Sequence, residues 1–203
     1  MTDALISTFY QMEAYFRSGG VVMLPLAAVS IAMWLLIINR ALYFRRLYRK
    51  NMNPRTAWEH ISEGRLPDPQ QYKGAVSLLV AEFMGRRSGN SALDRFILDE
   101  AVLKVNRSLD DFLGTIGVLA AVAPLMGLLG TVIGMIVTFD VIAVFGTGNT
   151  GAMAGGISEA LITTQTGLLV AIPGLYMKGF LDRRAHKLKQ RNAVVGYYLR
   201  RRL

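Results

Sequence analysis

The sequence predicts an all-α membrane protein with three transmembrane helices, and its hydrophobic composition and uneven basic charge carry that prediction. Hydrophobic residues make up 52% of the 203 residues and charged residues only 18%. Lys and Arg number one in residues 1–39, thirteen in 40–111, none in 112–177 and nine in 178–203. Because soluble domains rarely leave so long a stretch without a basic residue, the apolar segments are best explained as membrane spans.

Three apolar stretches are long enough to cross a bilayer. A membrane helix needs about 20 predominantly apolar residues to span about 30 Å of hydrocarbon. We expect the transmembrane helices at about 21–39, 112–139 and 157–180. The charged segments between and after these stretches are expected to continue as long cytoplasmic helices.

The basic residues set the expected orientation. Segments rich in Lys and Arg stay in the cytoplasm, and residues 40–111 and 178–203 together hold 22 of the 23 basic residues. The loop 40–111 and the tail 181–203 are therefore expected inside, with the N-terminal segment 1–20 and the connection 140–156 outside. Topology and attraction to anionic lipid account for the net charge of +9. No nucleic-acid partner is expected, because no aromatic-interleaved basic module accompanies the charge.

The segments flanking the first span have recognisable patterns. Residues 1–20 predict a short helix lying on the outer interface, and Gly19 and Gly20 separate it from the span. After the span, basic and aromatic residues alternate up to Lys50. This pattern fits a helix leaving the membrane with Tyr48 among its interfacial anchors, and binding of acidic lipid is the alternative.

Residues 91–111 predict an amphipathic helix in the cytoplasmic loop. Ser91 followed by Asp94 resembles a capping box. No Gly or Pro occurs between Ser91 and Leu113, so we expect one helix to run on into the second span. Its apolar residues recur at steps of three and four: Leu93, Phe96, Ile97, Ala101, Val105, Leu109 and Phe112.

The second span carries overlapping pairs of small residues. Gly130 pairs with Gly134 at a four-residue step, and Gly127 pairs with Thr131. Small residues let helix backbones approach closely in lipid, so we interpret these glycines as a packing face. Thr131 can satisfy its hydroxyl on its own backbone, which weakens the case for a pore role.

Glu159 is the only charged residue between Asp140 and Lys178. A carboxylate at membrane depth costs about 2.5–3.5 kcal/mol on insertion scales, which favours a functional role. Thr163 falls on the same helical stripe, as does Thr166. The alternative is that Gly156 is the N-cap and Glu159 is the third helical residue, favoured there by the helix dipole. Asp140 is interpreted as an interfacial carboxylate.

Metal and enzyme sites are not expected. The chain has no cysteine, and its two histidines, His60 and His186, have no paired spacing. No nucleophile–base pair, metal cluster or phosphate-binding loop is present in the sequence. We therefore expect no cofactor, no metal and no enzymatic activity.

Two sequence motifs, one in each of the second and third spans, closely resemble the paired signature of the MotA/TolQ/ExbB proton-channel family. The resemblance is nearest to the ExbB and TolQ members. The motifs are Ala123-Pro-Leu-Met-Gly-Leu-Leu-Gly-Thr-Val-Ile-Gly134 and Gly156-Ile-Ser-Glu-Ala-Leu-Ile-Thr-Thr-Gln-Thr-Gly-Leu-Leu-Val-Ala-Ile-Pro173. The resemblance covers the second and third spans at motif level. The first span and the basic loop fit it in length and layout.

The resemblance implies an assembly and a mechanism. The chain would be an inner-membrane subunit, with a periplasmic N-terminus, of a homo-oligomeric ring that is pentameric in this family. The ring would surround single-span helices of an ExbD- or TolR-like partner, whose membrane aspartate carries the protons. Proton flow would drive motion of the partner and energise outer-membrane transport through a TonB-like protein.

The same resemblance implies roles for particular residues. Glu159 would be the pore-facing glutamate, with Thr131 and Thr164 the pore threonines of the second and third spans. Thr164 lies about 140° from Glu159 on a straight helical wheel, so Thr163 is kept as the physical alternative. Pro173 closes the second motif and is grouped with the packing glycines.

The sequence leaves two alternative functions open. One is a TolQ-like motor subunit that maintains the envelope and moves no cargo. The other is a membrane scaffold that conducts nothing. Under the scaffold hypothesis, Glu159→Gln would leave energised transport intact.

Overall fold

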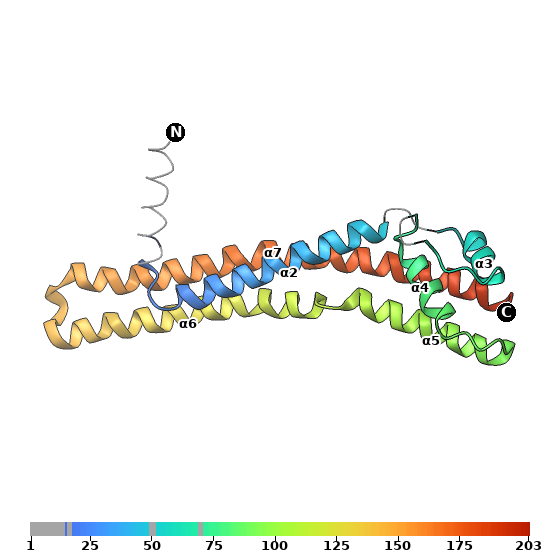
Figure 1. The fold of residues 1–203 in the computed structure, drawn as a ribbon. Helices are drawn as coiled ribbons and strands as arrows, with labels where there is room; N and C mark the ends of the chain where they lie inside the picture. The colour runs from blue at the N-terminus through green and yellow to red at the C-terminus, as the bar shows by residue number, and fades with distance from the viewer. Residues whose placement is uncertain (1–14, 16–17, 49–51, 69–70) are drawn as a thin grey trace, which may run out of the picture. The chain divides into compact units, whose positions relative to one another are not determined.

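The described residues form an all-α protein. The computed structural model describes Tyr15 and residues 18–48, 52–68 and 71–203, so the predicted interfacial helix in residues 1–20 falls largely outside it. No strand occurs among these residues. Figure 1 shows the helices in chain order: α2 (Met23–Tyr48), α3 (Pro54–Ser62), α4 (Ala75–Met84), α5 (Ser91–Asp110), α6 (Leu113–Phe145) and α7 (Thr150–Arg200), with a 3₁₀ turn at Gly146–Gly148 before α7.

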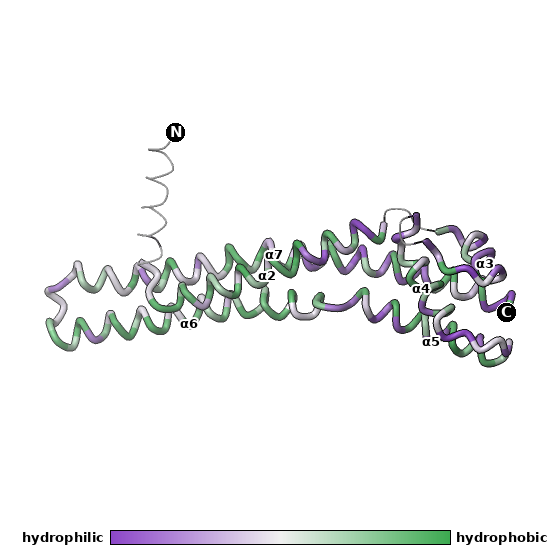
Figure 2. The backbone as a smooth tube through the Cα atoms, in the orientation of Figure 1, coloured by the Kyte–Doolittle hydropathy of each residue, from purple (hydrophilic) through white to green (hydrophobic). Residues whose placement is uncertain are grey.

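The chain divides into two compact units. Unit 1 contains residues 1–36 and 115–177, and unit 2 contains residues 37–114 and 178–203. The described residues include three helical stretches that are long and apolar enough to cross a membrane, within Met23–Tyr48, Ser91–Gly148 and Thr150–Arg200. Hydrophobic residues predominate in unit 1, whereas hydrophilic residues are more frequent in unit 2 (Figure 2). The predicted fold class is confirmed.

Small residues line the contact between α6 and α7 in unit 1. The buried positions recur every three or four residues on both helices, as expected for a long antiparallel pair. On α6 they are Ile116, Ala120, Ala123, Gly127, Gly130, Gly134 and Thr138. On α7 they are Gly156, Ala160, Thr163, Gly167, Ala171 and Gly174.

The two helix backbones approach each other closely along this contact. A Cβ atom added at Gly134 would lie 2.6 Å from the carbonyl oxygen of Gly156 and 2.9 Å from the amide nitrogen of Ala160. Lipid tails are as apolar as leucine, so helices in a bilayer associate through such van der Waals contact. Larger side chains at these positions would force the helices apart.

Unit 2 has its own hydrophobic core. Helices α3, α4 and α5 and the last turns of α7 bury a continuous cluster: Met52, Ala57, Ile61, Val76, Leu79, Val80, Phe83, Leu98, Ala101, Val105, Val195 and Leu199. Across α5 and α7, the buried Asn192 side chain donates to Asn106 Oδ1 at 3.1 Å. Charged pairs such as Lys104 with Glu82 (2.7 Å) and Arg200 with Asp99 (3.2 Å) lie at the surface of this core.

The expectation of one unbroken helix from residue 91 into the second span is wrong. Helix α5 ends at Asp110 and α6 begins at Leu113, with Phe112 at φ 62° between them. That backbone region is unusual for a bulky residue. The buried Arg40 occupies the break, donating to the Ser108 carbonyl at 2.7 Å, with its guanidinium 5.7 Å from the centre of the Phe112 ring.

The predicted capping box of α5 is also wrong. Asn90 is the N-cap, and its side chain accepts from the Ala92 amide at 3.0 Å. Asp94 instead turns back to accept from the amide of Ser88 at 2.7 Å and is buried. The predicted apolar face is right at Ala101, Val105 and Leu109 but not at Leu93, Phe96 or Phe112, which are exposed.

Helix also occupies most of residues 140–156, which the sequence suggested as a connection. Helix α6 continues to Phe145, and Asn149 begins α7 by accepting from the Ala152 amide at 3.2 Å. The alternative that Gly156 caps the third span is therefore wrong. Glu159 lies well inside α7, more than two turns from its start, so a capping role does not explain this carboxylate.

Candidate functional site

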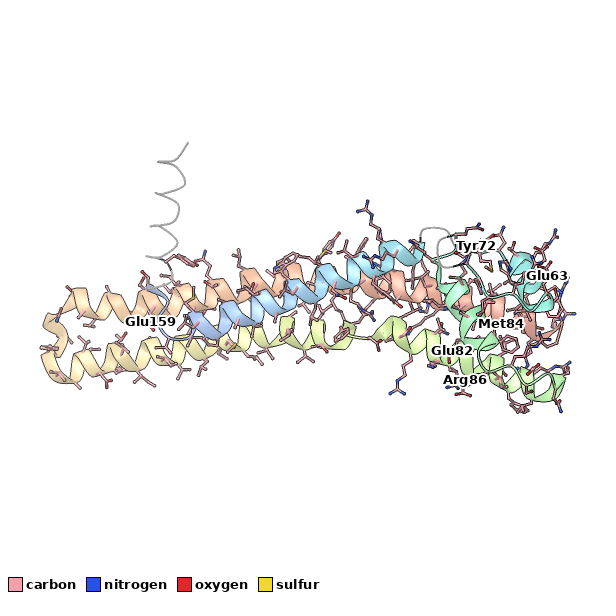
Figure 3. All side chains as sticks on the ribbon, in the orientation of Figure 1. Glu63, Tyr72, Glu82, Met84, Arg86 and Glu159 are labelled. Atoms are coloured by element: carbon pink, nitrogen blue, oxygen red, sulfur yellow. The ribbon has the colours of Figure 1, made fainter. Side chains whose placement is uncertain are left out.

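Glu159 lies on the side of α7 that faces the segment leading into α2 (Figure 3). Its side chain is half-buried, and its carboxylate rests against Gly20. No cation among the described residues lies within ion-pair distance of this carboxylate. A carboxylate on an apolar helix is costly at membrane depth and is a candidate functional group there.

Gly20 allows this arrangement for two reasons. Its φ is 64°, a left-handed conformation that glycine adopts without the Cβ penalty. A Cβ atom on Gly20 would also collide with the Glu159 carboxylate. The turn then starts α2, because the Met23 amide donates to the Gly20 carbonyl at 3.2 Å. The dipoles of the first turn of α2 favour a negative charge close by.

The two candidate threonines of α7 face different neighbours from Glu159. Thr163 is buried against Gly130 of α6, and its hydroxyl donates to carbonyls of its own helix at Glu159 and Ala160, both at 3.0 Å. Thr164 is half-buried and donates to the Ala160 carbonyl at 3.0 Å, with a longer 3.4 Å contact across to the Gly127 carbonyl of α6. Thr164 therefore lies at the α6–α7 contact, away from the turn that covers Glu159.

The remaining predicted residues are also placed by the structure. Thr131 is half-buried on α6 and donates to its own helix at Leu128, 2.6 Å away, as its sequence context suggested. Pro173 is half-buried inside α7 and leaves the carbonyl one turn earlier without its usual donor. The neighbouring Gly174 packs against the Met33 side chain of α2.

Sequence reasoning missed two residues that lie near Glu159. Gly20 was interpreted only as a helix breaker, although it covers the carboxylate. Tyr15 contacts α7 about two turns further along the helix, where its hydroxyl and that of Thr166 are 3.0 Å apart. Both are distant from Glu159 in the chain, so no local pattern reveals them, although adjacent glycines before a span do indicate a close backbone contact.

Within a single chain, the candidate residues do not form one continuous polar cluster. No hydrogen bond among the described residues joins the Glu159 side chain to Thr131, Thr163 or Thr164. No group of three His, Cys, Asp or Glu that could hold a metal ion occurs among them either. What the site offers chemically is one ionisable carboxylate, and the threonine hydroxyls donate to the backbones of their own helices.

These features define an all-α membrane protein whose second and third spans pack through small residues and whose third span carries the carboxylate of Glu159. Residues 73–193 match the model of the MotA/TolQ/ExbB proton channel family. The chain belongs to this family. The matched region includes α4, α5, α6 and most of α7, and therefore both motifs that carry the resemblance.

Relatives in several organisms extend the match to most of the chain. A protein of Methanothermobacter thermautotrophicus named as an ExbB homologue is 32% identical, over 92% of this chain and 70% of its own length. The biopolymer transport protein ExbB of Neisseria meningitidis is 27% identical, over 88% of this chain and 90% of its own. That of Salmonella typhimurium is 27% identical, over 83% and 74% respectively.

Proposed function

We propose that the chain is the ring-forming subunit of a proton-driven motor in the inner membrane. It couples the proton motive force to motion of a single-span ExbD- or TolR-like partner held within a homo-oligomeric, pentameric ring. The partner passes the work to a TonB-like protein and so energises outer-membrane transport. The coupling ion is the proton, and the chain needs no cofactor and performs no catalysis.

One observation carries this proposal more than any other: the placement of Glu159. It is the only charge in the stretch between Asp140 and Lys178, and α7 holds it well inside the helix, where capping does not account for it. Because this lone carboxylate costs free energy in an apolar segment, we infer that it polarises the path along which a partner's carboxylate exchanges protons.

The threonines have supporting roles in this proposal. Thr131 and Thr164 present hydroxyls near the α6–α7 contact, and neighbouring copies in a ring bring these faces toward a shared lumen. Thr163, which is buried against Gly130, serves packing instead. The N-terminus is periplasmic and the C-terminus cytoplasmic, because residues 40–111 and 178–203 hold almost all the basic residues.

The proposal is tested by replacing the carboxylate while keeping its shape. The chain carrying Glu159→Gln is co-expressed with its single-span partner in cells that lack the native pair. We expect uptake driven by the proton motive force to be lost. The molecular mass of the purified complex, measured by native mass spectrometry, should remain that of the wild-type ring.

Asp140→Asn provides a matched control. Asp140 is the other carboxylate that α6 and α7 carry within unit 1, and it is exposed. This variant should leave uptake unchanged. Normal uptake with Glu159→Gln would contradict the proposal and favour a non-conducting scaffold. If Glu159→Gln weakened the cell envelope without any uptake defect, the chain would instead have the TolQ-like role.

A further inference from the structure

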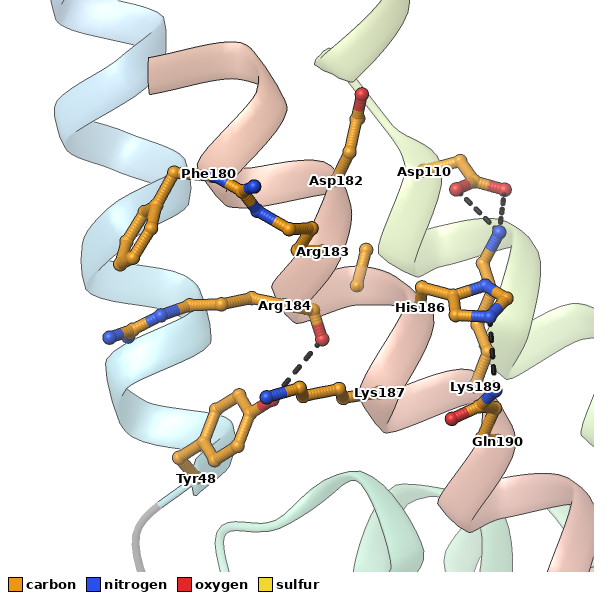
Figure 4. A pocket seen from close by; sticks show the side chains of 11 residues that line it. Tyr48, Asp110, Phe180, Asp182, Arg183, Arg184, His186, Lys187, Lys189 and Gln190 are labelled. Atoms are coloured by element: carbon orange, nitrogen blue, oxygen red, sulfur yellow. Dashed lines mark hydrogen bonds and ion pairs between the residues drawn. The ribbon is translucent and has the colours of Figure 1, made fainter. Parts of the chain in front are cut away.

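A large cavity opens in unit 2 beside the first charged turns that follow the third apolar stretch. Its volume is about 950 Å³, and it is bounded by the end of α2 at Tyr48, the end of α5 at Asp110 and the segment 180–190 of α7. Figure 4 shows the side chains that line it, which come from α2, α5 and α7. The cavity is much larger than a single small ion requires and falls in the range of small-molecule sites.

The carboxylates at this cavity already have partners. Lys189 binds both carboxylate oxygens of Asp110, and Lys178 pairs with Asp182 at 2.6 Å. Arg183 and Lys187 are exposed, and neither lies within ion-pair distance of a carboxylate among the described residues. The cavity therefore has an excess of positive charge that no acidic side chain of the described chain offsets.

A third cation is held in place by aromatic rings. The Arg184 guanidinium lies 4.5 Å from the centre of the Phe180 ring and 5.7 Å from that of Tyr48. The Tyr48 hydroxyl donates to the Arg184 backbone carbonyl at 3.3 Å, which ties the end of α2 to α7. An arginine fixed by stacking retains its N–H donors for an anion, and its fork matches phosphate oxygens.

The position of the cavity along α7 indicates the kind of anion. The apolar stretch ends at Met177, and Phe180 and Arg184 follow within about 5–10 Å along the helix at 1.5 Å per residue. The polar layer of a bilayer is roughly 5–8 Å thick on each side. Aromatic rings beside basic groups are typical of residues at this level. An acidic peptide would not require the rings or the membrane level.

We propose that this cavity binds the headgroup of an anionic phospholipid. The phosphate lies between Arg183, Arg184 and Lys187, and the upper acyl chains run along Phe180 toward the apolar stretch. This site is independent of Glu159 and of proton conduction. It would fix the end of α2 against α7 where both helices leave the membrane, and so make the stability of unit 2 depend on lipid composition.

The test measures lipid binding to the full-length protein in a neutral detergent by native mass spectrometry. Phosphatidylglycerol is titrated against the wild-type protein, with phosphatidylcholine as the lipid that carries no net charge. The double variant Arg183→Gln, Lys187→Gln should bind phosphatidylglycerol about 25-fold more weakly, at about fivefold for each basic group removed. The wild-type protein should prefer phosphatidylglycerol to phosphatidylcholine.

A charge-matched control lies further along α7 at Arg191 and just beyond its end at Arg201. The double variant Arg191→Gln, Arg201→Gln removes two exposed cations that do not line the cavity, and it should bind phosphatidylglycerol as the wild type does. The variant Arg183→Lys, Lys187→Arg keeps both charges and should retain binding. A melting temperature close to the wild-type value shows that each variant is folded.

Four results would overturn the assignment. Equal affinity for the two lipids, or equal loss in both glutamine double variants, would mean that binding is general basic attraction. Displacement of the lipid by millimolar inorganic phosphate would make the ligand a free phosphate. Displacement by a polyglutamate peptide would make it an acidic segment of a partner. If the protein bound no lipid at any concentration, another occupant, such as a second copy of the chain, would fill the cavity.

Discussion

Replacing Gly167 by alanine places a methyl group against the backbone of α6. The new Cβ would lie 2.7 Å from the Ala123 carbonyl oxygen and 3.2 Å from the Gly127 Cα. These atoms belong to the main chain and cannot rotate away. The two helices would have to separate by several tenths of an ångström along a contact that also includes Gly134 and Gly156.

Two opposing effects set the size of the change. Overpacking a tight contact costs about 1–3 kcal/mol, whereas exchanging a helical glycine for alanine gains about 0.5–1 kcal/mol. We therefore expect Gly167→Ala to lower the free energy of unfolding by about 1–2 kcal/mol. Gly155 is the matched control, because a Cβ there meets nothing within 4 Å. Gly155→Ala should raise the stability by about 0.5–1 kcal/mol.

The opposite signs make the comparison decisive. Unfolding is followed by titrating a denaturing detergent into protein held in mild micelles, with fluorescence from Trp34 in unit 1 as the signal. Because the two variants are the same substitution in the same helix, helix propensity cancels between them. If Gly167→Ala were as stable as Gly155→Ala, the close α6–α7 contact described above would be wrong.

Three further predictions concern other parts of the chain. Arg40→Ala should destabilise unit 2 by about 2–4 kcal/mol, measured by thermal unfolding, because the charged hydrogen bond to the Ser108 carbonyl and the aromatic stacking are both lost. Burial alone would raise the pKa of Asp94, but hydrogen bonds from Ser88 and Arg87 outweigh it and lower the pKa below its ordinary 3.8. The ionised Asp94 carboxylate therefore contributes its full stabilisation above about pH 4, and this contribution is lost as the pH falls through the lowered pKa. Melting temperatures measured from pH 3 to 7 should show this loss in the wild type but not in Asp94→Asn. Gly20→Ala should displace the Glu159 carboxylate and reduce energised uptake while the ring mass is unchanged.

The three apolar helices could be predicted from the sequence because a bilayer span requires a length and composition that few other structures share. A packing face on the second span was likewise predicted from Gly127, Gly130 and Gly134. Their packing follows from the absence of side chains, which is a local property. In each case the physical cause lies within one segment, so the feature can be predicted from the sequence of that segment alone.

The features that could not be predicted depend on contacts between distant segments. The break before α6 contains neither glycine nor proline, and Arg40, some 70 residues earlier, stabilises it by binding the Ser108 carbonyl. Residues 140–156 were expected to form a connection, yet α6 continues to Phe145 and α7 begins at Thr150. The contact between Glu159 and Gly20 is equally non-local. The roles proposed for Thr131 and Thr164 require contacts with neighbouring copies, and these roles remain predictions.

Proton flux through the reconstituted complex tests the central claim most directly. The chain and its single-span partner are placed in liposomes that enclose a pH-sensitive dye, and a potassium gradient with valinomycin imposes the membrane potential. We expect proton entry with the wild-type chain and with Asp140→Asn. Glu159→Gln, incorporated to the same level and with the same ring mass, should reduce entry to that of liposomes without protein. Equal proton entry through the Glu159→Gln complex would contradict the account.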